Sequence, residues 1–325
     1  MLVGGGLSLL RRLPVVTDMY VMRVLSAILG VLTLWTAWLG ARLVFGEALA
    51  MTIVAVLAVH PQFVIASTAA GPDAVVNLAG GLIWWQTAEA LHRPTSMWSL
   101  VALWIAAIGA AAVDRMGVSL LGSALLVSMF IVMRRYGLRS RIMLCILIGA
   151  AIVGVGVRLN DDVWHGVGDT LHTALLPVPD ARSWNYVWLF HSSLFEGWWL
   201  TLGWAEYPPP DWWVLGALGI SVIAAIGVFR SVIERRVPDA IAIAILMVAI
   251  QLVAVDWVYF RPAVGAQGRH LFPVLIPSLV LLCAGWDRLL APSLGSRARV
   301  ALVLVVAALD TAGWLTLAIP VYGRG

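Results

Sequence analysis

The polar run that ends at residue 270 has the residue types of a phosphate-binding site. It holds Arg261-Pro262 and then Gln267-Gly268-Arg269-His270, so that two arginines, a glutamine and a histidine lie close to glycines. Guanidinium groups and exposed backbone N–H groups both donate hydrogen bonds to phosphate oxygens. Arginines at such a place also form interfacial belts that contact lipid phosphates. The sequence therefore predicts either an anion site formed by Gln267, Arg269 and His270 or an interfacial belt.

A second group of charges, Asp114-Arg115, lies in a turn with almost no loop around it. Adjacent opposite charges in a low-dielectric setting can neutralise each other or pair with their neighbours. The alternative is that Arg115 binds a phosphate group with its planar fork of donors. Both interpretations stay open, and Arg115 is a candidate substrate-binding residue.

A candidate carboxylate follows the run His60-Pro61-Gln62-Phe63, which leads to Gly71-Pro72-Asp73. Proline inside an apolar segment is expected to kink the helix, and Gly71-Pro72 is expected to end it. Asp73 is then either the N-cap of the next helix or a carboxylate that binds a metal ion or an acceptor. In the second interpretation Asp73 is a substrate-binding residue and the candidate ligand of a divalent metal ion.

The stretch from Phe195 to Pro210 is rich in tryptophan, glycine and proline. Tryptophan favours the headgroup level of a bilayer, so residues 184–204 are expected to lie along the membrane surface as a helix or a re-entrant segment. Its aromatic rings either anchor the chain at the interface, or stack on sugar rings and cover a lipid tail. Trp204 is the candidate substrate-binding residue of the second interpretation.

The sequence has no Walker loop, no Gly-rich dinucleotide turn, no zinc-ligand spacing and no G-x-S-x-G nucleophile. Any chemistry must therefore depend on carboxylates and arginines, with a divalent metal ion as the one cofactor expected. These groups suit a transfer in which a base activates the acceptor while cations hold a departing phosphate. The sequence does not identify the catalytic residue.

The composition indicates the kind of element that must position these residues. Of 325 residues, 62% are apolar and 12% are charged, and the mean hydropathy is +0.95. Soluble domains are about half apolar and about a quarter charged, so an ordinary cytosolic enzyme, a disordered chain and a nucleic-acid binder are excluded. Membrane lipid is an expected partner and nucleic acid is not. The prediction is an all-α, polytopic transmembrane helical bundle.

A spanning helix needs about 20 mostly apolar residues. Ten segments meet this test, and together they predict one integral membrane domain over 1–325 with a long loop or lid at 158–211. The segments are Tyr20 to Phe45, Met51 to Thr68, Ala74 to Ala90, Leu100 to Val113, Met116 to Met133, Ile142 to Val157, Trp212 to Phe229, Ala240 to Phe260, Leu271 to Leu290 and Val300 to Pro320.

The arginines predict the orientation of the spans. Alternating the loops places twelve of the 21 basic residues, all arginines, in five short connections on one side of the membrane. The positive-inside rule assigns that side to the cytoplasm, so both termini and the loop 158–211 are expected outside. The twelve are Arg42, Arg93, Arg134, Arg135, Arg139, Arg141, Arg230, Arg235, Arg236, Arg288, Arg297 and Arg299. The expected location is a bacterial plasma membrane.

Four of these patterns together carry a resemblance to a known family. They are Met22 to Ser26, His60 to Phe63 with Pro72 to Ala74, Phe195 to Pro210, and Gln267 to Pro273. In this order the chain resembles the bacterial membrane proteins of domain of unknown function family 2142. That family is similar in turn to GT-C glycosyltransferases, such as protein mannosyltransferases and aminoarabinose transferases, which take a sugar from a polyprenyl-phosphate donor on the outer face.

The resemblance implies roles for three residues. Asp73 corresponds to an acidic residue close to the donor or a metal, Arg115 to a basic residue after the fifth span of such enzymes, and Arg269 to a position beside the donor phosphate. The resemblance further implies that the usual catalytic acid of the first outer loop is missing, since the chain is expected to begin near the end of that loop. A start placed too late in the gene, a truncation that has lost activity and a base supplied by a partner chain are the explanations we consider.

The expected function is the transfer of a sugar from a polyprenyl phosphate to a cell-envelope acceptor on the outer face. A transporter or flippase for a lipid-linked precursor is the rival, and it predicts polar residues near the midplane of several spans and repeat symmetry. An inactive membrane scaffold is the third alternative.

Overall fold

The computed structural model describes residues 15–93, 98–136, 149, 184–202, 207–235, 237–259 and 267–322. These residues form helices, apart from short connections and one isolated bridge between Leu202 and Tyr207. Among these described residues, five helices are long and apolar enough to cross a membrane, or six if a bent pair of helices is one span. The prediction of an all-α polytopic bundle is confirmed, whereas the number of ten spans stays a prediction.

The first half of the chain gives α2 (Val15–Phe45), α3 (Glu47–Ala58), α4 (Pro61–Thr68), α5 (Asp73–His92), α6 (Trp98–Val113), the 3-10 turn η1 (Arg115–Gly117) and α7 (Val118–Tyr136). The connection of α6 to α7 is longer than predicted, because Met116 and Gly117 belong to η1 rather than to the next span. The predicted span from Ile142 to Val157 lies outside the described residues apart from Gly149.

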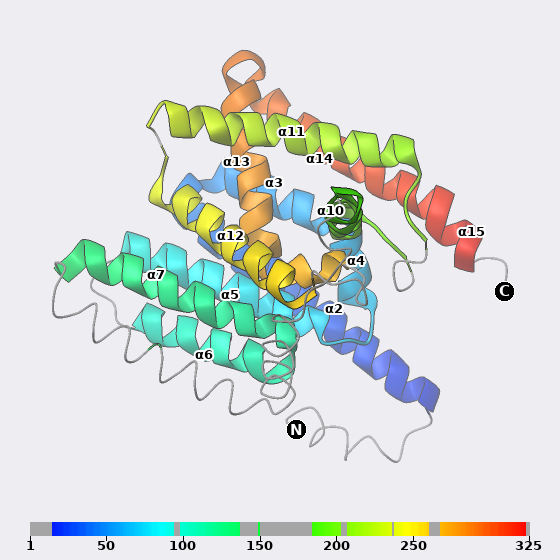
Figure 1. Ribbon diagram of the computed structural model, residues 1–325, viewed down its shortest axis with the longest axis horizontal. Helices are drawn as coiled ribbons and strands as arrows, with labels where there is room; N and C mark the ends of the chain where they lie inside the picture. The colour runs from blue at the N-terminus through cyan, green and yellow to red at the C-terminus, as the bar shows by residue number, and fades with distance from the viewer. Residues whose placement is uncertain are drawn as a thin grey trace.

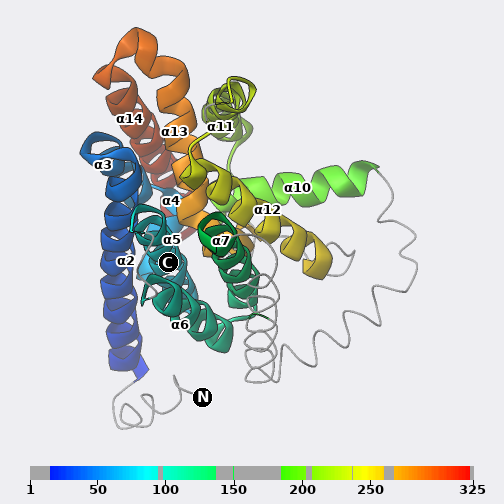
Figure 2. The ribbon, with the colours of Figure 1, turned by 90° about the vertical axis from the view of Figure 1, so that its left-hand side faces the viewer.

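The second half gives α10 (Trp184–Trp199), α11 (Asp211–Ile233), α12 (Asp239–Tyr259), the 3-10 segment η2 (Gly268–Val274), α13 (Leu275–Leu294), α14 (Ser296–Gly313), the π-helical turn η3 (Trp314–Ala318) and α15 (Ile319–Tyr322). In Figure 1, α11, α12 and α14 run across the picture while α10 is seen nearly end-on; Figure 2 reverses this for α10 and α11. The predicted helix after residue 184 is confirmed, and it lies crosswise to the neighbouring long helices.

The proline in the second predicted span breaks the helix as expected. Helices α3 and α4 meet at an angle of 64°. Pro61 occupies the first turn of α4, where its missing N–H removes no hydrogen bond. The His60 side chain caps the new helix, because its Nδ1 accepts a hydrogen bond from the N–H of Phe63 at 3.4 Å. The break places residues 69–72 at the same end of the bundle as η1 and η2 (Figure 1).

Two apolar clusters hold the helices together. One joins α2, α3, α11, α13 and α14 around Ile53, Trp213 and Leu279, and the other joins α5, α6, α7 and α12 around Leu103 and Met247. The outward faces of α2, α11 and α14 expose large apolar side chains instead of burying them. Such continuous apolar surface is typical of a bundle that faces lipid.

Helices α11 and α13 approach closely at small residues. A Cβ atom added at Gly227 would overlap the carbonyl group of Gly285, and one added at Gly285 would overlap that of Ala224. Membrane helices often pack through small residues, which let their backbones approach closely. In lipid, dispersion contacts and interhelical hydrogen bonds drive helix association, because the hydrophobic effect does not act between helices there. On the same helix α11, Gly219 has open space where its Cβ would be.

We predict that Gly227→Ala destabilises the protein, since α11 and α13 must move apart. Overpacking of this kind costs about 1–3 kcal/mol. The thermal midpoint in detergent should fall by several degrees, at about 2–4 °C for each kcal/mol. Gly219→Ala is the matched control and should leave the midpoint within a degree or so of the parent protein. Equal midpoints for both variants would contradict this packing.

Candidate functional site

The candidate site lies where three turns meet at one end of the bundle. These are the connection from α4 to α5, the turn η1 before α7, and the segment η2 before α13. Segment η2 is central, because it packs against α5, α10, α12 and η1. The close approach of η2 to α5 needs a glycine, since a Cβ atom at Gly80 would lie 2.5 Å from the carbonyl oxygen of Pro273.

Asp73 is the first residue of α5 and stands before its apolar part, which starts at Ala74. The prediction that Asp73 is the N-cap is wrong: Pro72 holds that position with φ −70°, and no side chain caps the helix. The Pro72 carbonyl accepts hydrogen bonds from Val75 and Val76 and so starts the helix without a side-chain cap. Consequently, the Asp73 carboxylate does not cap the helix.

Asp73, Asp114 and Arg269 form one electrostatic cluster. Burial raises the pKa of Asp73 from its ordinary value of 3.8, the Arg269 guanidinium lowers it and the Asp114 carboxylate raises it further, with the net shift upward. The three residues come from α5, the turn before η1 and η2, so the fold joins residues that are about 40 and 155 positions apart in sequence. The structure thus brings together two of the predicted site residues, Asp73 and Arg269.

The Asp114 side chain shapes the turn that carries it. Its Oδ1 accepts a hydrogen bond from the N–H of Met116 at 2.7 Å, and its backbone carbonyl accepts one from Gly117 at 3.0 Å. These bonds form the 3-10 turn η1, whose first residue is Arg115. The backbone of Arg115 therefore lies next to the cluster, while a role of its side chain in phosphate binding stays a prediction.

A chain of polar groups fixes η2 in place. The buried Gln251 of α12 donates a hydrogen bond from Nε2 to the carbonyl oxygen of His270 at 2.5 Å. The Oε1 atom of Gln251 accepts from the Ser119 hydroxyl at the start of α7. Because Gln251 has no exposed surface, this link is shielded from solvent. The chain holds η2 at a defined position relative to α7 and α12.

The three η2-region candidates differ in exposure. His270 is buried, whereas Gln267 and Arg269 are half-buried. The Gln267 carbonyl accepts a hydrogen bond from the N–H of His270 at 3.0 Å, and its side chain caps nothing. Gln267 and Arg269 are therefore accessible to a ligand, while His270 is bonded to Gln251 through its carbonyl, and a role of its side chain in binding stays a prediction.

Helix α10 and η2 are in direct backbone contact. A Cβ atom at Gly268 would overlap the backbone of Gly197, and one at Gly197 would lie 2.5 Å from the backbone nitrogen of Gly268. The close crossing of α10 and η2 therefore requires glycine at both positions. Next to it, His60 stacks on Trp199 with ring centroids 5.3 Å apart and meets Trp198 edge-on at 4.8 Å. The predicted residue Trp204 lies outside the described residues.

Burial also raises the pKa of Glu196, the residue before Gly197, and Asp211 adds to the rise. Glu196 lies on α10, beside the contact with η2, and is half-buried. It is a second carboxylate at this end of the bundle whose protonated form is favoured by its surroundings.

The donor set at the cluster fits a divalent ion only in part. Within the described ranges, no group of three or more His, Cys, Asp or Glu side chains could hold a metal ion. Mg²⁺, however, is often bound by one or two carboxylates, with substrate phosphates and water completing the shell. Asp73 and Asp114 fit that smaller requirement, and Asp73 stays a predicted metal ligand.

An apolar groove of about 590 Å³ starts beside η2 and runs between α10, α11, α12 and α13. The end of the groove next to η2 is formed by Phe195, Trp198 and Leu271. Leu271 lies two residues after Arg269 in the sequence. The far end of the groove reaches Phe229 and Val232 in the last turns of α11. A groove that is almost entirely apolar and runs along the helices has the shape and chemistry for a hydrocarbon chain.

Sequence reasoning missed several polar residues of the cluster and of the segments packed near it. Asn77 is buried one turn after Asp73 on the same face of α5, and among the described residues neither of its amide atoms has a hydrogen-bond partner. The spacing of four residues could have identified it. Gln251 and Gln62, whose Oε1 accepts from the N–H of Thr201 at 3.4 Å, gave no such signal, because their partners are far away in sequence.

Fold and composition define a helical membrane protein. Residues 9–157 match the model of the dolichyl-phosphate-mannose-protein mannosyltransferase family. The match covers less than half of the chain, from before α2 to beyond α7, and includes Asp73 and Arg115 but not η2. The chain is thus similar over this part to a GT-C type of membrane glycosyltransferase. The resemblance to family 2142 stays a prediction. No curated protein and no solved structure matches the chain.

Proposed function

We propose that the protein is a membrane glycosyltransferase that moves a sugar from a polyprenyl-phosphate donor to a cell-envelope acceptor on the outer face. The observation that carries this proposal is the position of η2, which bears Arg269 within electrostatic range of Asp73 and Leu271 in an apolar groove. A polyprenyl-phosphate sugar needs both environments next to each other. The family match over residues 9–157 supports the same class of reaction.

The roles follow from the chemistry of the groups. Asp73 acts as the base: its carboxylate takes the proton of the acceptor hydroxyl, whose oxygen forms a bond to the anomeric carbon of the sugar. The bond between that carbon and the phosphate oxygen breaks, and polyprenyl phosphate leaves with the bonding electrons. Arg269 stabilises the charge that develops on this phosphate. A carboxylate with a raised pKa is a better base at neutral pH.

A divalent ion, if the reaction needs one, would be held by Asp73 and Asp114 together with the donor phosphate. It would supply positive charge next to the departing phosphate. The measurement is the rate of transfer after chelation, with Mg²⁺ and Mn²⁺ added back.

The proposal is tested with the full chain, purified in detergent and reconstituted into vesicles with a radiolabelled polyprenyl-phosphate sugar. We expect the release of polyprenyl phosphate and the appearance of label in an acceptor fraction from the cell envelope. A lack of donor consumption with every envelope fraction would overturn the proposal. Movement of the donor across the bilayer without sugar transfer would establish the transporter alternative.

The charge distribution favours the enzyme over the transporter. In α5, α11 and α12 the charged residues lie in the first or last turns, as in Asp73 and Glu89 of α5 or Asp239 and Asp256 of α12. A transporter is expected to place ionisable groups near the midplane of its spans. Asp256 is instead 3.4 Å from His191 of α10, at the end of the bundle that carries the candidate site.

The groove makes a separate prediction about the donor tail. Ala225→Phe places a ring in the groove from the exposed face of α11 and should raise KM for a long-chain donor about tenfold, which corresponds to about 1.4 kcal/mol. A donor with a short prenyl chain should show an unchanged KM, because its tail does not reach Ala225. Leu218→Phe is the control on the same helix, outside the groove. An equal rise of KM for both donors would contradict the assignment of the groove.

A further inference from the structure

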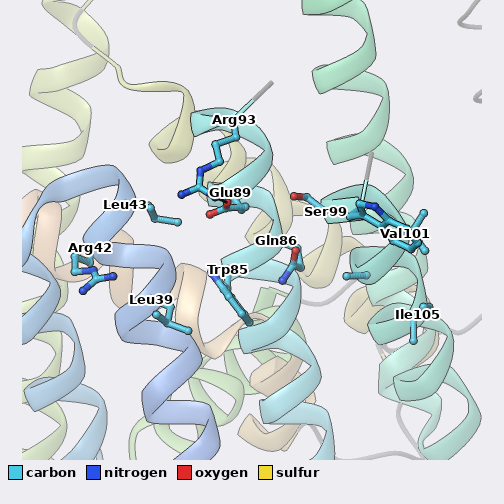
Figure 3. A pocket seen from close by; sticks show the side chains of 12 residues that line it. Leu39, Arg42, Leu43, Trp85, Gln86, Glu89, Arg93, Ser99, Val101 and Ile105 are labelled. Atoms are coloured by element: carbon cyan, nitrogen blue, oxygen red, sulfur yellow. Dashed lines mark ion pairs between the residues drawn. The ribbon is translucent and has the colours of Figure 1, made fainter. Parts of the chain in front are cut away.

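A second cavity, of about 560 Å³, lies between α2, α5 and α6 (Figure 3). It borders the last two turns of α5, from Trp85 onward, whereas the candidate site borders the first turn at Asp73, so that about 18 Å of helix separates them. The cavity is therefore not part of the candidate site. It belongs to the end of the bundle at which the arginines gather, which the positive-inside rule assigns to the cytoplasm.

The rim of this cavity is polar and carries net positive charge. Gln86, Glu89 and Arg93 come from the C-terminal end of α5, and Arg42 comes from α2 (Figure 3). Two arginines against one carboxylate leave one positive charge among the lining residues. Arg93 pairs with Glu89 at 3.1 Å. The guanidinium carbon of Arg42 lies 4.2 Å from the centre of the Trp38 ring, a cation–π contact that orients the arginine.

The wall of the cavity is apolar and continues onto the outer surface of α6. Leu39, Leu43 and Ala102 line the inside. Ile105 and Val101 of the same wall are 65% and 44% exposed, and Trp98 at the rim is 80% exposed. In a bundle that faces lipid, such residues lie against acyl chains, and a tryptophan at the end of a helix marks the headgroup level. The cavity thus opens sideways into the membrane.

We propose that this cavity binds an acidic phospholipid. The headgroup phosphate lies between Arg42 and Arg93, Gln86 donates a hydrogen bond to it, and one acyl chain runs along Val101 and Ile105. A soluble anion would use the arginines but not the apolar wall, and a zwitterionic lipid would bring its own cation to a rim that is already positive. Basic pockets between helices at the cytoplasmic end are suited to anionic headgroups. The site is independent of sugar transfer.

Native mass spectrometry of the full chain, released from detergent in the presence of defined lipids, tests the proposal. We expect one tightly held phosphatidylglycerol, with a preference of about tenfold over phosphatidylcholine of the same chain length. Arg42→Gln should lower the occupancy about tenfold. Arg297→Gln is the matched control, because Arg297 is exposed at the same end of the bundle but does not line the cavity; it should keep the bound lipid.

Ala102→Phe gives a second, charge-neutral test, because it fills the cavity from the α6 wall and should displace the lipid while both arginines remain. Occupancy is measured for each variant beside its thermal midpoint, so that loss of lipid is scored only on folded protein. Equal retention of the two lipids, full retention in both Arg42→Gln and Ala102→Phe, or equal loss in Arg297→Gln would overturn the proposal. Displacement of the lipid by inorganic phosphate at millimolar concentration would show a site for a free anion and would also overturn it.

Discussion

Replacing Asp73 by asparagine should lower kcat for sugar transfer by about 10²–10⁴-fold, the range for removal of a general base. Asparagine keeps the size and one acceptor oxygen but cannot take the proton of the acceptor hydroxyl. Binding of the donor without a divalent ion should change little, since the amide does not disturb the groove or Arg269. The measurement is single-turnover transfer with a polyprenyl-phosphate sugar, beside a donor-binding assay. Full activity of the variant would remove Asp73 from the mechanism.

The pH profile gives an independent check on the same residue. Activity requires ionised Asp73, so the rate should fall as the pH drops through its pKa, which burial and Asp114 hold above 3.8. Asp114→Asn removes the neighbouring negative charge and should move this acid limb to lower pH. Asp211→Asn removes a charge that acts on Glu196 instead, and it should leave the limb unchanged. If the acid limb did not move in Asp114→Asn, Asp114 would have no influence on the pKa of Asp73.

Arg269→Gln should lower kcat/KM by about 10²–10³-fold, the usual loss when a donor that stabilises a developing charge is removed. Arg269→Lys keeps the charge but loses the planar fork of donors, so it should recover only a part of the activity. Arg297→Gln, at the other end of the bundle, serves as the control for loss of one arginine.

The same substitution should also change the acid limb. Because the Arg269 guanidinium lowers the pKa of Asp73, its removal should move the acid limb of the residual activity to higher pH, opposite to the effect of Asp114→Asn. Opposite shifts in the two variants would show that Arg269 and Asp114 both act on the pKa of the same carboxylate, that of Asp73. Shifts in one direction would contradict the cluster.

Much of the fold follows from the sequence because lipid imposes a simple requirement. Every backbone N–H and C=O in hydrocarbon must be bonded, so long apolar runs become helices, and Pro61 breaks one of them where a proline must. Boundaries follow less well. The N-terminal end of the ninth predicted span is a 3-10 segment, because η2 is shaped by contacts with α10 and α12 that local sequence does not reveal.

The site is predictable only in its parts. Charges that interrupt apolar segments identify Asp73 and Arg269, since the cost of burying charge makes such residues rare. Their proximity to Asp114 depends on how three turns pack against one another, and the spacing of these residues in the sequence does not predict it. Gln251 is the clearest example: a single glutamine within an apolar helix could face any neighbour, and the fold turns it toward the His270 carbonyl.

The contact between Gly197 and Gly268 has a mechanical consequence. With no side chain between the two backbones, α10 and η2 cannot slide or separate independently without losing their closest packing. An acceptor or lipid that tilts α10 would therefore shift Arg269 as well. Movement of the crosswise helix α10 would thus pass through this single crossing to η2, the segment whose Arg269 we propose as the phosphate ligand.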